Sequence, residues 1–156
     1  MTSHPPFKPR FPWITGDLQT VRNFFAGPRR WPAPQEVLTV DLGDGTGDRC
    51  RVAVDRPGTV TRRPILLIHG LTGCEGSAYM LQAMDHFLGE GRPVIRMNQR
   101  GAGPGAPLAG QHYHAGRSRD IAAVIVGLLG DLAADLTKDG LVAMGFSLGG
   151  NALLKY

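Results

Sequence analysis

The chain of 156 residues is poor in cysteine and has no long apolar run, and these absences exclude several classes of protein. Its two cysteines, Cys50 and Cys74, form no C-x-x-C pair and no metal-binding pattern, so we expect free thiols and no metal site. The N-terminus shows no apolar segment of the kind found in secretory signals, and no stretch is long enough to span a bilayer. We therefore expect a cytoplasmic protein.

The sequence also lacks a concentrated run of basic residues. It contains 17 Lys and Arg against 13 Asp and Glu, which gives a formal net charge of +4 at pH 7. Because this mild excess is spread along the chain, we expect no nucleic-acid partner. The composition, with 42% hydrophobic and 19% charged residues, is typical of a globular domain.

Residues 1–35 differ in composition from the rest of the chain, because proline, aromatic and basic residues gather there. We expect an N-terminal arm that packs its aromatic side chains onto a domain formed by residues 36–156. A contact between this arm and a membrane surface is the alternative, since basic and aromatic residues suit a lipid interface, although no clean amphipathic helix supports it.

The remaining sequence alternates between strand-like and helix-like patterns. Residues 36–42 and 49–54 predict two strands joined by a hairpin turn, whose aspartates lack the spacing of a calcium-binding loop. Apolar runs predict further strands at 65–68 and 141–144, and we expect another strand at 93–97. Apolar stripes predict helices at 77–88 and 118–137. This order predicts an α/β fold, with a mostly parallel sheet preceded by an antiparallel hairpin.

The central motif is G-x-S-x-G at residues 145–149, between a predicted strand and a predicted helix. Gly145 and Gly149 would permit a sharp turn that exposes the hydroxyl of Ser147. A serine in this context predicts the nucleophile of an acyl-transfer reaction, although it needs a neighbouring base.

Such a reaction also needs two N–H groups that stabilise the oxyanion of the intermediate. One candidate donor is the backbone N–H of Leu148, which follows the serine. The other is the N–H of Leu71, in the loop after the first buried strand, where Gly70 would let the loop approach Ser147.

A second glycine pattern, Gly101-x-Gly103-x-x-Ala106, superficially matches a dinucleotide-binding fingerprint with Asp120 as its acidic residue. Pro104 and Pro107, however, would break the helix that should receive the pyrophosphate, and Asp120 lies at a helix start. We therefore expect no dinucleotide cofactor.

Taken together, these motifs resemble the α/β-hydrolase superfamily, and within it the YheT-like (ABHD-type) branch of predicted esterases. The matching residues are Trp13 with 17–20, 69–73 with 77–80, 98–101, 113–116, 145–151 and 153–156. The resemblance implies the α/β-hydrolase fold and hydrolysis of carboxylic esters, with a small-molecule or lipid ester as substrate. It also implies that no metal or organic cofactor is needed.

In that superfamily the triad acid and histidine follow the serine along the chain, but neither residue type occurs after Ser147 here. Of the upstream histidines, we expect His69 to shape its loop, and His112 and His114 to order a loop or line the pocket. We therefore interpret the chain as the N-terminal half of a hydrolase, inactive alone and truncated after the start of the helix that follows Ser147. Residues 141–144 would then form an exposed apolar edge strand. The alternative is a non-catalytic, hydrolase-like protein that binds a ligand or a partner.

Overall fold

A computed structural model of the chain describes residues 7–19 and 33–156. Much of the predicted arm lies outside these residues. The chain divides into two compact units, residues 1–31 and 32–156, and residues 16–19 of the first are helical. Six of the arm's aromatic and basic residues lie outside the described residues: Arg22, Phe24, Phe25, Arg29, Arg30 and Trp31.

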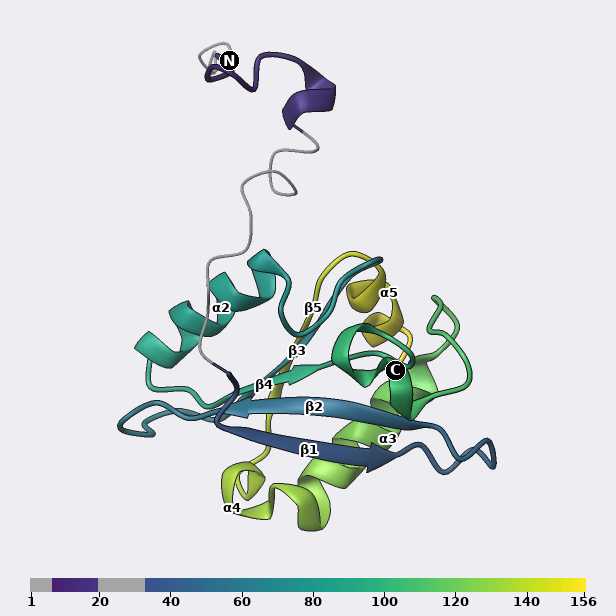
Figure 1. Ribbon diagram of the computed structural model, residues 1–156. Coiled ribbons are helices and arrows are strands. Elements are labelled where there is room, and N and C mark those ends of the chain that lie inside the picture. Colours follow the sequence, from purple (N-terminus) through teal and green to yellow (C-terminus); the bar gives the residue numbers. More distant parts are fainter. Residues whose placement is uncertain (1–6, 20–32) are drawn as a thin grey trace. The chain divides into compact units, whose positions relative to one another are not determined.

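The second unit is built on a five-stranded sheet (Figure 1). Its strands are β1 (Glu36–Asp41), β2 (Arg49–Asp55), β3 (Ile65–Ile68), β4 (Val94–Met97) and β5 (Val142–Gly145). The spatial order is β1-β2-β4-β3-β5. β2 pairs antiparallel with β1 and with β4, whereas β3 pairs parallel with both β4 and β5. The predicted hairpin and the predicted parallel sheet are confirmed, in one mixed sheet.

The parallel strands β3 and β4 are buried along their whole length. The unbroken apolar run of β3 predicts this burial. In β4 the buried Arg96 interrupts the apolar residues and pairs with Asp55 of β2 at 2.7 Å.

In the register of the sheet, Ile68 at the end of β3 lies opposite Gly145 at the end of β5. The two strands therefore finish at the same level, and the loops that follow them emerge side by side. The loop with Leu71 and the turn with Ser147 therefore both lie at this edge of the sheet.

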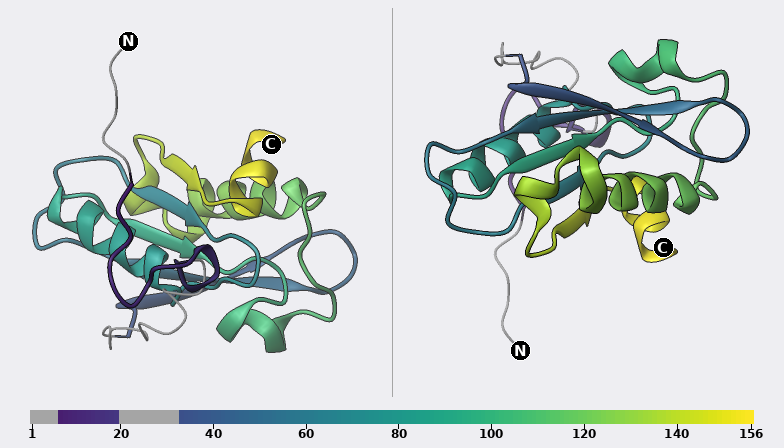
Figure 2. Two further views of the ribbon diagram at one scale, coloured as in Figure 1. Left: turned by 90° about the horizontal axis from the view of Figure 1, so that it is seen from above. Right: turned by 90° about the horizontal axis from the view of Figure 1, so that it is seen from below.

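Helices cover both faces of the sheet (Figure 2). They are α2 (Ala78–Gly89), α3 (Ser118–Gly127), α4 (Ala134–Thr137) and α5 (Leu148–Leu154). α2 packs on one face, while α3 and α5 lie together on the other. The main core joins Leu66 and Ile95 of the sheet to Ile121 and Val124 of α3, all at 1% exposure or less. Each such side chain stabilises the fold by about 1.5–3 kcal/mol.

The prediction of one continuous helix over residues 118–137 is wrong. α3 ends at Gly127, a π-helical segment follows at Leu128–Leu132, and α4 begins at Ala134. Within the break, Gly130 has the non-helical angles φ −83° and ψ −127°. Glycine is the least favourable residue in a helix after proline, so Gly127 and Gly130 weaken the helix where the apolar stripe continues.

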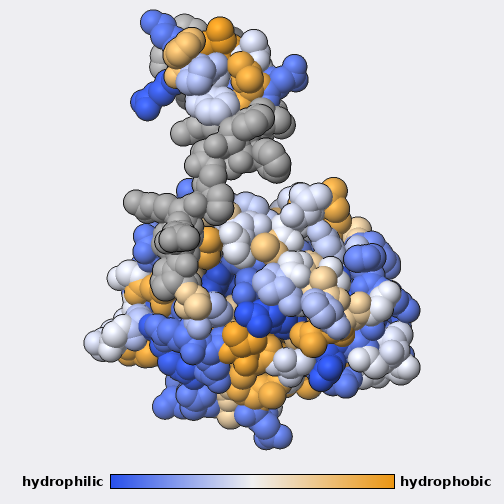
Figure 3. Space-filling view, in the orientation of Figure 1, coloured by the Kyte–Doolittle hydropathy of each residue, from blue (hydrophilic) through white to orange (hydrophobic). Residues whose placement is uncertain are grey.

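β5 lies at the open edge of the sheet, and Val142 and Met144 are 41% and 38% exposed there. The opposite edge strand, β1, carries a small hydrophobic patch surrounded by hydrophilic residues (Figure 3).

Within residues 7–19 and 33–156, no helix combines the length and the apolar character that a membrane span requires.

Candidate active site

Ser147 occupies the turn between β5 and α5, where its backbone is strained. Its angles are φ +50° and ψ −116°, and a positive φ is uncommon for any residue other than glycine. Such strain gathers at functional sites, where the surrounding structure maintains it. The side chain of Ser147 is exposed, and its hydroxyl makes no hydrogen bond to any other described residue. The turn thus presents a free hydroxyl at the carboxyl edge of the sheet.

The glycines of the motif are needed for close backbone contacts. A β-carbon at Gly145 would lie 2.5 Å from the backbone nitrogen of Gly150. A β-carbon at Gly149 would lie 2.4 Å from the carbonyl oxygen of His69. Both distances are far below van der Waals contact, so a side chain at either position would push α5 away from the strands.

The loop after β3 lies directly against the serine. A β-carbon on Gly70 would lie 3.1 Å from the β-carbon of Ser147 and 3.1 Å from the carbonyl oxygen of Phe146. The N–H of Phe146 also donates to the carbonyl oxygen of Ile68 at 2.9 Å. The structure therefore brings Gly70 and Ser147 together across the ends of two parallel strands.

The predicted oxyanion donors, Leu71 and Leu148, have unused N–H groups. Leu148 is the first residue of α5, and its N–H has no acceptor in the described part of the chain. In the loop, the N–H of Gly73 donates to the carbonyl oxygen of Gly70 at 3.1 Å. The N–H groups of Gly70 and Thr72 donate to tyrosine hydroxyls at 2.9 Å and 2.8 Å. Leu71 alone among residues 70–73 keeps an N–H without an acceptor among the residues described.

His69 is buried, and both of its ring nitrogens contact backbone groups. Its Nε2 atom accepts from the N–H of Gln99 at 3.0 Å, and its Nδ1 atom lies 2.8 Å from the carbonyl oxygen of Gly70. The side-chain amide of Gln99 in turn donates to the carbonyl oxygen of His69 at 2.7 Å. Burial lowers the pKa of His69, so the neutral ring is favoured. These contacts make His69 a support of the loop and leave it no nitrogen for Ser147.

The other described histidines also make no hydrogen bond with Ser147. His86 lies on α2, where its Nε2 atom is 3.4 Å from a carboxylate oxygen of Glu90. His114 accepts the N–H of Gly116 at 3.0 Å and so orders its own loop, and His112 is exposed in the same loop. His4 lies outside the described residues.

An ionic cluster around the buried side chain of Arg100 was missed by sequence reasoning. The guanidinium of Arg100, 0% exposed, donates to both carboxylate oxygens of Asp120 at 2.8 and 2.9 Å. It also donates to Asp48 at 2.9 Å and to Asp44 at 2.6 Å. The hairpin aspartates and the start of α3 are thus joined through one side chain. Because these partners are 20 to 56 residues away in the sequence, no local pattern could indicate the cluster.

Hydrogen bonds and opposite charges in this cluster favour the ionised forms of Asp44, Asp48 and Arg100. The hydroxyl of Thr46 and the guanidinium of Arg100 lower the pKa of Asp44. The N–H of Gly110, together with Arg100, lowers the pKa of Asp48. Hydrogen bonds to Asp120 and Asp44 raise the pKa of Arg100. Asp120, the residue of the discarded dinucleotide pattern, is therefore committed to Arg100.

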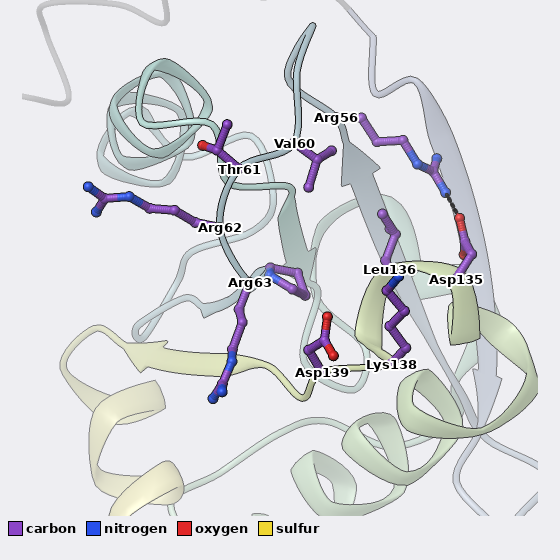
Figure 4. Close-up of a pocket in the computed structure, with 10 residues that line it drawn as sticks. Arg56, Val60, Thr61, Arg62, Arg63, Asp135, Leu136, Lys138 and Asp139 are labelled. Carbon is purple, nitrogen blue, oxygen red and sulfur yellow. Dashed lines mark ion pairs between the residues drawn. The ribbon is translucent and has the colours of Figure 1, made fainter.

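A separate pocket of about 800 Å³ lies near the starts of β3 and β5, at the end of these strands opposite to Ser147. Figure 4 shows Arg56 of its wall facing Asp135, whereas Arg62 and Arg63 point away from its centre. The chemistry described above is therefore not located in this pocket. In the ranges that the structure describes, no three His, Cys, Asp or Glu side chains are grouped so as to hold a metal ion.

Solved structures with the same fold include several hydrolases. A serine hydrolase without a lid from Xanthomonas campestris is 28% identical, with a TM-score of 0.56 over 76% of this chain and 53% of its own. An esterase from Pyrococcus furiosus is 18% identical, with a TM-score of 0.66 over 83% of this chain and 50% of its own. Est1E from Butyrivibrio proteoclasticus, solved with ferulic acid bound, is 19% identical, with a TM-score of 0.62 over 75% of this chain and 45% of its own.

The chain thus spans about half the length of these solved structures. Comparison with curated proteins gives no significant match. Residues 63–156, which include β3, the loop with Leu71 and the turn with Ser147, match the sequence model of the family described as alpha/beta hydrolase fold. The chain therefore belongs to the alpha/beta hydrolase family.

Proposed function

We propose that this chain supplies the nucleophile and the oxyanion hole of a serine hydrolase that acts on carboxylic esters. The observation that carries the proposal is the strained turn at Ser147, pressed against the loop with the unused N–H of Leu71. The hydroxyl of Ser147 would give its proton to the histidine base, attack the ester carbonyl carbon and form an acyl-enzyme as the alcohol leaves with that proton. Water would then hydrolyse the acyl-enzyme to the carboxylic acid and restore Ser147. The N–H groups of Leu71 and Leu148 would donate to the oxyanion.

In this proposal the histidine base and the acid come from sequence beyond Tyr156. The support is that no described histidine hydrogen-bonds with Ser147, while the matched solved structures are about twice as long. The resemblance of residues 98–101 and 113–116 to YheT-like esterases supports assignment to that branch. A cytoplasmic location remains part of the same proposal.

The substrate class we propose is an ester with a short-chain or lipid acyl group. The side chain of Leu71 is 66% exposed in the loop that contacts Ser147, which supports an apolar group beside the reacting carbonyl. A series of p-nitrophenyl esters with increasing acyl length would define the preferred group through kcat/KM.

Labelling with a fluorophosphonate probe tests the nucleophile in the full-length protein. We expect the probe to modify Ser147 and the variant Ser147→Ala to lose both labelling and ester hydrolysis. Ser118→Ala, at the start of α3, is the matched control and should retain both. Labelling that persists in Ser147→Ala would contradict the proposal.

The alternative is a ligand-binding protein that keeps the hydrolase fold without catalysis. The specific observation in its favour is the absence, within the described residues, of a histidine bonded to Ser147. This alternative predicts that the full-length protein binds a carboxylic ester in calorimetry but neither hydrolyses it nor reacts with the fluorophosphonate probe.

A further inference from the structure

Two tyrosine hydroxyls hold the loop that contains Leu71, one on each side of that residue. The N–H of Gly70 donates to the hydroxyl oxygen of Tyr79 at 2.9 Å. The N–H of Thr72 donates to the hydroxyl oxygen of Tyr113 at 2.8 Å. Tyr79 lies on α2 and Tyr113 in the loop before α3, so the two hydroxyls come from separate parts of the fold.

The peptide unit between Gly70 and Leu71 is held through its carbonyl group. The carbonyl oxygen of Gly70 accepts the N–H of Gly73 at 3.1 Å and lies 2.8 Å from Nδ1 of His69. In a planar trans peptide the N–H points opposite to the carbonyl, so fixing the oxygen of Gly70 also fixes the direction of the N–H of Leu71. The tyrosines hold the peptide units before and after it.

Thr72 shows why this loop needs external support. Its φ is +59°, in the left-handed region that β-branched residues rarely adopt. The hydroxyl of Thr72 donates to the carbonyl oxygen of Leu71 at 2.7 Å, and its N–H is bound by Tyr113. A strained backbone persists only where surrounding contacts maintain it. Loss of the Tyr113 hydroxyl would therefore permit the Leu71–Thr72 peptide to rotate.

We propose that Tyr79 and Tyr113 are positioning residues that hold the N–H of Leu71 in the orientation of an oxyanion donor. The inference rests on the proposed function, in which that N–H stabilises the tetrahedral intermediate. Neither tyrosine touches the reacting atoms in this account. Each acts through the peptide unit that its hydroxyl binds.

Both aromatic rings are anchored independently of their hydroxyls. The ring of Tyr79 packs against Phe146 with a centroid distance of 4.9 Å. The ring of Tyr113 meets His69 edge-on at 5.3 Å, and the N–H of Tyr113 donates to the carbonyl oxygen of Arg100 at 3.0 Å. Tyr→Phe substitutions should therefore retain the rings and remove the hydrogen bonds alone.

The kinetic test compares Tyr79→Phe and Tyr113→Phe in the full-length protein with p-nitrophenyl acetate as substrate. We expect kcat to fall about tenfold in each variant while KM stays within about twofold, because the donor is misoriented but not removed. This loss is smaller than the hundredfold or greater effect of deleting an oxyanion donor. Tyr156→Phe is the matched control, since Tyr156 is 59% exposed and its hydroxyl has no hydrogen-bond partner among the described residues. It should leave kcat unchanged.

A readout without catalysis separates this inference from the proposed function. In protein labelled with ¹⁵N-glycine and ¹⁵N-threonine, Tyr113→Phe should speed the amide exchange of Thr72, and Tyr79→Phe that of Gly70. Tyr156→Phe should change neither. Unchanged exchange at both amides would overturn the tyrosine contacts. Faster exchange with an unaltered kcat would overturn their positioning role. Wild-type protein without Ser147-dependent hydrolysis would refute the proposed function, while amide exchange would still decide whether the tyrosines hold the loop.

Discussion

The Nε2 atom of His69 accepts a hydrogen bond from the backbone N–H of Gln99 at 3.0 Å. Since Nε2 acts as an acceptor, the ring proton must lie on Nδ1, which faces the carbonyl oxygen of Gly70. One ring nitrogen thus supports the strand end at Gln99, and the other supports the loop beside Ser147. The contact explains why a histidine next to the candidate nucleophile is structural.

This arrangement predicts a single neutral tautomer for His69. Long-range ¹H–¹⁵N spectra should show an Nδ1-protonated ring at neutral pH. The ring should become doubly protonated only at a lower pH than an ordinary histidine, because burial lowers the pKa of His69. The unfolded chain takes up a proton near pH 6.5 and the folded chain only at lower pH, so the free energy of unfolding should fall as pH drops below about 6.5. Double protonation of His69 in the folded protein at or above the pH at which the unfolded chain is protonated would contradict this account.

The contact between Gly149 and His69 predicts a strong effect of one methyl group. Gly149→Ala should lower the free energy of unfolding by about 2 kcal/mol, because the new β-carbon meets backbone that cannot move freely. Gly89→Ala is the matched control, since Gly89 also lies in a helix and has nothing within 4 Å of its β-carbon position. It should leave stability unchanged or raise it by up to about 1 kcal/mol. Urea unfolding measures both, and equal effects would refute the steric argument.

The cluster around Arg100 should be essential for stability. Arg100→Met would leave the carboxylates of Asp48 and Asp120 buried without their cation, and the free energy of unfolding should fall by about 3 kcal/mol or more. Arg56→Met is the control, because Arg56 also pairs with two carboxylates, those of Glu36 and Asp135, but at the surface. Its loss should change stability by less than about 1 kcal/mol. Equal unfolding midpoints for the two variants would contradict the role of Arg100.

The two cysteines should differ in their reactivity. Burial, reinforced by the charge of Asp120, raises the pKa of Cys50 to about 12, so its thiolate is scarce at pH 8. Cys74 is half-buried. Iodoacetamide at pH 8 should therefore alkylate Cys74 first in the folded protein, and both cysteines in urea. Mass spectrometry of tryptic peptides checks the order, and rapid alkylation of Cys50 in the folded state would be inconsistent with its burial.

The sequence predicts the parts of the fold whose pattern is local. An unbroken apolar run indicates β3, which is buried on both faces of the sheet. Alternation of apolar and polar residues indicates the hairpin of β1 and β2. The helix break near Gly130 is not predicted, since the apolar stripe continues past it through Leu132 and Leu136. Packing against the sheet and the low helix propensity of glycine together decide that segment.

In the candidate site, too, local patterns indicate some residues, whereas the roles of others depend on contacts between distant parts of the sequence. The G-x-S-x-G pattern indicates Ser147 and Leu148, and the loop after the first buried strand indicates Leu71. Tyr113 and Arg100 could not be given their roles from the sequence, because their contacts join residues that are 20 to 56 positions apart. Asp44 and Asp48 are predicted only as turn residues, although they also neutralise a buried guanidinium.

The register that places Ile68 opposite Gly145 determines how the loop after β3 and the turn after β5 are aligned. Leu71 and Leu148 each lie three residues beyond their member of this pair, so the alignment of the two strands determines the spacing of the two candidate donors. A slip of one residue would shift β5 by about 3.3 Å along β3 and turn each of its side chains to the other face of the sheet. The positions of the two candidate donors around Ser147 thus depend on the hydrogen bonds between two four-residue strands.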